Sequence, residues 1–97
     1  MSNPIDVLTR LAEHRPELQG HGVTGLWLFG SAARGELTVD SDIDLLVEFE
    51  RPVSLFELAR LRRHLEEWLG RPVDLVTREA LKPRLRARIL REAVRAA

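Results

Sequence analysis

The sequence predicts an α/β or α+β domain with a small mixed β-sheet covered by helices. Short runs of large apolar residues alternate with segments in which apolar residues recur every three to four positions, a pattern typical of strands and amphipathic helices. A chain of 97 residues can bury one core, and 44% hydrophobic with 31% charged residues is ordinary for a globular protein. We therefore expect residues 1–97 to form a single domain in the order helix, strand, strand, helix, strand, helix.

The N-terminal part of the chain predicts one helix and one strand. Asn3 is suited to cap a helix that begins at Pro4, and the sequence His-Arg-Pro at 14–16 is expected to end it. Residues 23–29 form a run rich in large apolar side chains, and Gly30 follows it. This pattern predicts a buried strand that ends at the glycine.

A second strand is predicted soon after the first. A short helical turn at 31–34 and a polar connector at 36–40 lead to Ser41, where the strand is expected to begin. Because the connector is too short for a helical crossover, the two strands are expected to be antiparallel. Alternation places Ile43, Leu45, Val47 and Phe49 on a core face, and Asp42, Asp44, Leu46 and Glu48 on the opposite face.

The C-terminal part predicts a long helix, a short strand and a final helix. Ser54 and Glu57 form an S-x-x-E capping box, and Gly70 ends the helix that the box begins. The sequence Val-Asp-Leu-Val at 73–76 predicts the third strand. A final amphipathic helix follows a proline and is expected to extend through Arg95.

Composition excludes several classes of function. The 15 basic and 15 acidic residues cancel, so no overall charge favours nucleic acid, and the absence of cysteine excludes disulfides, thiolate metal sites and cysteine nucleophiles. No signal-peptide pattern or run long enough for a membrane span occurs. We expect a cytoplasmic protein without direct contact to nucleic acid or membrane.

The candidate functional site lies in residues 29–47. The Gly30-Ser31 turn offers backbone N–H groups and a hydroxyl, which can hold a phosphate. Asp42 and Asp44 point to one side of a strand, and two such charges together favour a bound cation. Mg²⁺ commonly lies between one or two carboxylates and substrate phosphates. Each motif alone also fits an ordinary turn or a polar strand edge, but together they indicate a nucleotide site.

Asp74 would complete a cluster of three carboxylates if the third strand lies beside the second. Sites with two metal ions promote in-line displacement at phosphorus, and attack at the α-phosphate of a nucleoside triphosphate would release pyrophosphate. Kinase and hydrolase readings are poor, because the P-loop lysine is absent and no histidine pattern accompanies Ser31.

The remaining aromatic and charged residues carry weaker signals. The tryptophans, Trp27 and Trp68, are expected in the core, and the arginines of the final helix on a solvated or partner-facing surface. The histidines lie in no metal-ligand spacing and are expected at the surface; they are His14, His21 and His64.

The same motifs carry a family resemblance. Gly30-Ser31-x-x-Arg34-Gly35, Ser41-Asp42-Ile43-Asp44-Leu45 and Val73-Asp74-Leu75 resemble the minimal nucleotidyltransferases of the DNA polymerase β-like superfamily. The resemblance implies the nucleotidyltransferase fold and ATP as the donor substrate.

The resemblance also implies roles for individual residues. Gly30 and Ser31 would contact the triphosphate, and Arg34 would either touch phosphate or hold the loop through an ion pair. Asp42 and Asp44 would bind Mg²⁺, as one or two ions. Asp74 would be a further metal ligand or the base for the acceptor.

The acceptor is expected to lie on another chain, because little sequence follows the third strand. By the resemblance, it is a tyrosine of a HEPN-domain toxin, to which the chain, as antitoxin, transfers AMP from ATP. Two alternatives stay open: a non-catalytic antitoxin that masks its partner, and transfer to a small molecule such as an aminoglycoside. A homodimer, or a hetero-oligomer with the toxin, is expected.

Overall fold

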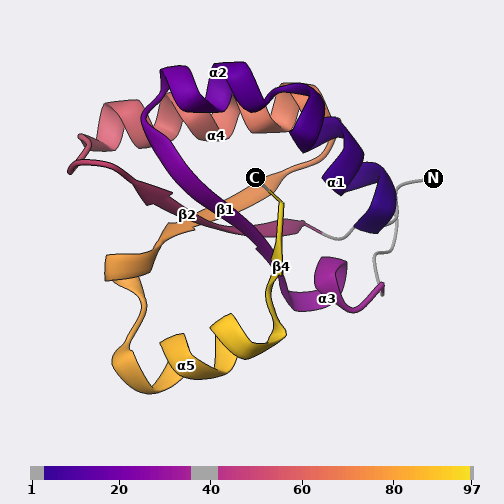
Figure 1. Cartoon of the computed structure of the whole chain (residues 1–97), viewed down its shortest axis with the longest axis vertical. Helices are drawn as coiled ribbons and strands as arrows, with labels where there is room; N and C mark the ends of the chain where they lie inside the picture. The colour runs from indigo at the N-terminus through magenta and orange to yellow at the C-terminus, as the bar shows by residue number, and fades with distance from the viewer. Residues whose placement is uncertain (1–3, 36–41, 97) are drawn as a thin grey trace.

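The computed structural model describes residues 4–35 and 42–96 and shows an α+β architecture (Figure 1). A mixed four-stranded sheet with helices confirms the predicted fold class. In chain order, the elements are α1 (Pro4–Glu13), α2 (Arg15–Gly20), β1 (Val23–Phe29), α3 (Gly30–Ala33), β2 (Ile43–Phe49), α4 (Leu55–Leu69), β3 (Val73–Thr77), a 3₁₀ turn η1 (Arg78–Ala80), α5 (Pro83–Glu92) and β4 (Val94–Arg95). No helix within these described ranges has the length and apolar character needed to cross a membrane.

The sheet has the strand order β3-β2-β1-β4. As predicted, β1 and β2 are antiparallel, with Leu28 opposite Leu45. β2 and β3 are parallel, and α4 provides the crossover that such a pair requires. The strand that carries Asp44 therefore lies inside the sheet, between β1 and β3.

One face of the sheet forms the hydrophobic core. Figure 1 shows α1, α2 and α4 together on this side of the sheet. Alternate strand residues point into the core, as the apolar pattern predicted, and they are Leu26, Leu28, Ile43, Leu45, Val47, Val73 and Leu75. The helices contribute Val7, Leu11, Leu18, Leu61, Leu65 and Leu69. Packing on this face fixes the strands whose opposite face carries the candidate site.

The ends of α4 agree with the signals in the sequence. The Ser54 hydroxyl accepts a hydrogen bond from the Glu57 backbone N–H at 3.2 Å, as an N-cap does. Gly70 ends the helix with a left-handed φ of 69°, and its N–H donates to the Glu66 carbonyl at 2.8 Å. The Glu66 carboxylate in turn accepts the Val73 N–H at 2.9 Å, which joins α4 to the start of β3.

Two early boundaries need comment. The prediction that residues 14–16 begin a loop is wrong, because α2 starts directly after α1. Pro16 lies in the first turn of α2, where the missing N–H of proline has no intrahelical partner to lose. β2 begins at Ile43, and the predicted connector and Ser41 fall within 36–41, outside the described residues.

The C-terminal boundary and the tryptophans also differ from expectation. The final helix ends at Glu92, because residues 94–95 form β4 and pair with the edge of β1. The Arg95 guanidinium lies over the Trp27 ring, 5.2 Å from its centre. Trp27 and Trp68 are only partly buried, so the prediction that both lie in the core is wrong. Each has one ring face against a polar partner, which the apolar pattern did not reveal.

The opposite face of the sheet is covered less completely. α5 lies on this side, away from the other long helices (Figure 1). None of its side chains is buried, and Leu85 on its expected apolar side is 44% exposed. The strand side chains on this face are therefore accessible in a way that the core residues are not.

Candidate functional site

The candidate carboxylates gather at one end of β2 and β3. Asp44 and Asp74 are the second residues of their strands, and the parallel register sets them side by side. Asp42 directly precedes β2. Because neighbouring strands lie about 4.8 Å apart, side chains at paired positions on one face lie close together. The structure thus places the third strand beside the second, the condition on which the three-carboxylate hypothesis depended.

Burial and neighbouring charge act together on Asp44. Its side chain is partly buried, whereas Asp42 and Asp74 are exposed. Burial is the main cause that raises the pKa of Asp44 above its ordinary value, and the negative charges of Asp74 and Asp42 raise it further. The guanidinium of Arg34 acts in the opposite direction and lowers this pKa. The balance leaves excess negative charge at Asp44, which favours binding of a cation.

Gly30 lies directly against the Asp44 carboxylate. Its φ of +66° is in the left-handed region that favours glycine. A Cβ at this position would collide with Oδ2 of Asp44, so no larger side chain fits between the turn and the carboxylate. The residue before the glycine, Phe29, is paired with Asp44 across β1 and β2. The antiparallel pairing therefore brings the turn of the predicted phosphate motif to the carboxylates.

Arg34 lies near both Asp44 and α5. Its Nη1 atom is 3.9 Å from Oε2 of Glu92, and both side chains are about half exposed. This ion pair matches one of the two roles expected for Arg34, that of holding the loop. The sequence gave no signal for Glu92, because only the tertiary fold brings α5 beside α3. Ser31 lies in α3, but its side chain falls outside the described part of the structure.

The donor set fits a hard divalent cation. Asp42, Asp44 and Asp74 offer only carboxylate oxygens, and the raised pKa of Asp44 marks charge that a cation would offset. Within residues 4–35 and 42–96, no three His, Cys, Asp or Glu side chains are arranged to hold a metal ion by themselves. That finding agrees with a Mg²⁺ site that needs phosphate oxygens as well as carboxylates.

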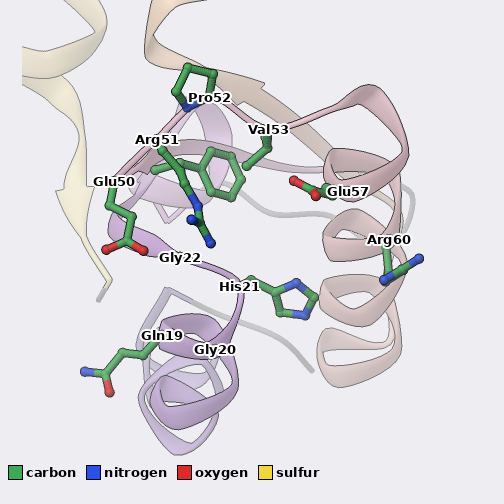
Figure 2. A pocket seen from close by; sticks show the side chains of 11 residues that line it. Gln19, Gly20, His21, Gly22, Glu50, Arg51, Pro52, Val53, Glu57 and Arg60 are labelled. Atoms are coloured by element: carbon green, nitrogen blue, oxygen red, sulfur yellow. The ribbon is translucent and has the colours of Figure 1, made fainter.

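Two surface cavities lie at the other end of β2. Their volumes are about 330 Å³ and about 440 Å³, and both are lined by the segment 49–53, which follows the end of the strand. Figure 2 shows the first of them, between the loop after α2 and the start of α4. Neither is lined by a predicted site residue, so these cavities are separate from the carboxylate site.

Comparison with known proteins gives consistent matches over nearly the whole chain. A family model described as a nucleotidyltransferase domain matches residues 5–96. A candidate protein adenylyltransferase of Methanocaldococcus jannaschii is 51% identical over 79 residues, covering 81% of this chain and 85% of that protein. The protein adenylyltransferase MntA of Thermococcus cleftensis is 44% identical over 85 residues, covering 87% of this chain and 86% of that protein.

Solved structures give the same fold. A candidate minimal nucleotidyltransferase superimposes with a TM-score of 0.85 at 42% identity, covering 96% of this chain and 95% of that one. A toxin–antitoxin structure with AMP-PNP matches with a TM-score of 0.77 at 21% identity, over 93% and 72% of the two chains. A complex of an MNT antitoxin with a tri-AMPylated HEPN toxin of Shewanella oneidensis matches at 0.69 and 18% identity, over 94% and 71%. At these lower identities, the likeness shows the fold alone.

Proposed function

The chain belongs to the nucleotidyltransferase domain family and is a protein adenylyltransferase, and we propose that it transfers AMP from ATP to a HEPN-domain toxin whose antitoxin it is. One observation carries the proposal for the site: Asp44 has Asp74 beside it in register and Gly30 against its carboxylate. The acceptor class is supported by the related antitoxins that are found in complexes with HEPN toxins.

The three aspartates have separable tasks in this proposal. Asp42 and Asp44 would hold Mg²⁺, with Asp74 as a third carboxylate. When bound, Mg²⁺ supplies positive charge that offsets the charge of the phosphate oxygens during in-line displacement. The partly buried position of Asp44 fixes one carboxylate, whereas the exposure of Asp74 leaves it open to an acceptor that arrives from solvent.

The transfer forms one bond and breaks another at the α-phosphorus. The acceptor oxygen, which we assign to a tyrosine hydroxyl, bonds to the α-phosphorus as the bond to the β-phosphate oxygen breaks. Pyrophosphate leaves, and the hydroxyl proton passes to a base, for which Asp74 is the candidate. The absence of a Cβ at Gly30 lets the turn backbone lie beside the carboxylates, where its N–H groups can meet the phosphates.

The direct test uses ATP labelled at the α-phosphate, Mg²⁺ and the HEPN-domain protein encoded beside this chain. We expect label on a tyrosine of the partner, and loss of that label with Asp44→Asn or Asp42→Asn. Glu48→Gln is the matched control, because Glu48 lies on the same strand face but is paired with Arg78 at 2.9 Å. This variant should retain transfer.

The same assay distinguishes the alternatives. A stable complex that never acquires label would show an antitoxin that masks its partner. Label on an aminoglycoside, with growth protection against that drug, would show a small-molecule acceptor. Full transfer by the Asp42→Asn/Asp44→Asn double variant would contradict the assignment of the carboxylates.

A further inference from the structure

A row of four rings lies on the outer side of α2 and α4, far from the aspartates in sequence. His14 stacks on Trp68 with ring centres 4.1 Å apart and planes 4° apart. Trp68 lies 5.8 Å from His64, and His64 lies 5.3 Å from His21. The sequence predicted histidines without ligand spacing, but the fold brings His21 and His64 together from separate elements.

The geometry of the pair suits a shared metal ion. The rings of His21 and His64 are 5.3 Å apart and tilted by 55°. Two imidazoles bound to one tetrahedral ion at metal–nitrogen distances of about 2.0–2.1 Å place their ring centres about 5 Å apart. We propose that His21 and His64 form a site for a borderline divalent transition-metal ion, such as Zn²⁺ or Ni²⁺, that joins the loop after α2 to α4.

The surroundings of the pair support this assignment. Nδ1 of His64 is 3.9 Å from Oε2 of Glu67, and such a carboxylate partner leaves Nε2 for the metal. Burial is the main cause that lowers the pKa of His21, followed by the charges of His64 and Arg60, while Glu57 raises it. His21 is therefore neutral near pH 7, the form that binds metals. Glu57 and Glu67 supply negative charge against Arg60.

Access and the remaining ligands come from solvent. Figure 2 shows the His21 ring pointing toward α4 at the edge of the cavity of about 330 Å³, which Glu57 and Arg60 also line. The described residues place no third His, Cys, Asp or Glu ligand with the pair, so water would fill the other positions. Such a site binds weakly and exchanges readily. Its nitrogen ligands distinguish it from the oxygen-only carboxylate site, which suits Mg²⁺.

The test is calorimetric titration of the full chain with NiCl₂ or ZnCl₂, carried out in an Asp44→Asn background so that the carboxylate end contributes less. We expect one ion per chain, and a loss of affinity of about 100-fold or more for His21→Gln or His64→Gln. Glu67→Gln should lose about tenfold or less, as expected of a residue that orients a ligand. His14→Gln is the matched control, because His14 belongs to the ring row but not to the pair, and its affinity should be unchanged.

A second readout does not require the variants to fold. In the unsubstituted chain, the ring NMR signals of His21 and His64 should shift with Ni²⁺ or Zn²⁺, while those of His14 stay in place. MgCl₂ should move none of them. Absence of binding, or equal affinity in the His21→Gln and His64→Gln proteins, would overturn the proposal. None of these measurements depends on nucleotide transfer, so the site and the proposed function stand or fall separately.

Discussion

On one face of the sheet, alternate strand residues lie beneath α1, α2 and α4, with exposed fractions between 0% and 9%. On the other face, the same strands carry Asp44, Asp74 and Glu48, and the helix on that side, α5, buries none of its side chains. The first face holds the fold through apolar contact, and the second carries charge at a cost in stability. Each strand therefore separates stability from chemistry by the alternation of its side chains.

The largest expected effect compares two adjacent leucines of β2. Leu45 and Leu46 are both fully buried, but only Leu45 belongs to the core cluster. Leu45→Ala should lower the free energy of unfolding by about 2–5 kcal/mol, as measured by urea denaturation. Leu46→Ala should cost clearly less, because the loosely covered face can close around the smaller side chain. An equal or larger loss at Leu46 would show that α5 packs tightly on the sheet.

The next effect has the opposite sign. Because the folded state raises the pKa of Asp44, this group favours the folded state most at low pH, and that contribution is lost as the pH rises through the raised pKa. Without Mg²⁺ at neutral pH, Asp44→Asn should therefore stabilise the chain, by no more than about 1 kcal/mol for a partly exposed group. Thermal unfolding across pH measures it.

Mg²⁺ with ATP sharpens the same prediction. These ligands should raise the melting temperature of the unsubstituted chain and leave that of Asp44→Asn nearly unchanged, because a ligand stabilises only the state that binds it. A less stable Asp44→Asn protein at neutral pH without Mg²⁺ would mean that Asp44 has a stabilising partner. Glu48→Gln should destabilise instead, since it removes the 2.9 Å pair with Arg78.

The smallest effect tests whether α5 contributes to the site at all. Glu92→Gln removes the half-exposed pair with Arg34, and pairs of this kind contribute about 0–1 kcal/mol. We expect the KM for ATP to rise by up to about fivefold with little change in kcat. The double variant with Arg34→Gln should lose no more than Arg34→Gln alone, because both act through one contact. Additive losses would separate Glu92 from Arg34, and Glu79→Gln is the neutral control.

The sequence predicted those features that local patterns determine. The antiparallel first pair of strands followed from a short connection, and both ends of α4 followed from Ser54 and Gly70. The turn glycine and the aspartates also lie where period-two alternation and the apolar runs placed them. Such features depend on a few neighbouring residues, so a single sequence carries them.

Features that depend on distant residues were missed. β4 consists of two residues and exists because β1 has an open edge, as the hydrogen bond from the Ala96 N–H to the Leu26 carbonyl at 2.7 Å illustrates. The pair of His21 and His64 joins a loop to a helix, and no spacing within the sequence predicts their contact. Pro16 was read as the end of a helix, although proline fits the first turn of a new helix equally well.

The contact between Gly30 and Asp44 makes these two positions a single unit of variation. A larger residue at 30 forces the carboxylate away, and a side chain at 44 that is short enough to make room has lost the carboxylate reach. Shortening Asp44 to glycine in a Gly30→Ala protein would relieve the collision yet would not bring back a negative charge. An evolving lineage can therefore repair the shape of this corner or keep its chemistry, but no one-step change from Gly30→Ala recovers both.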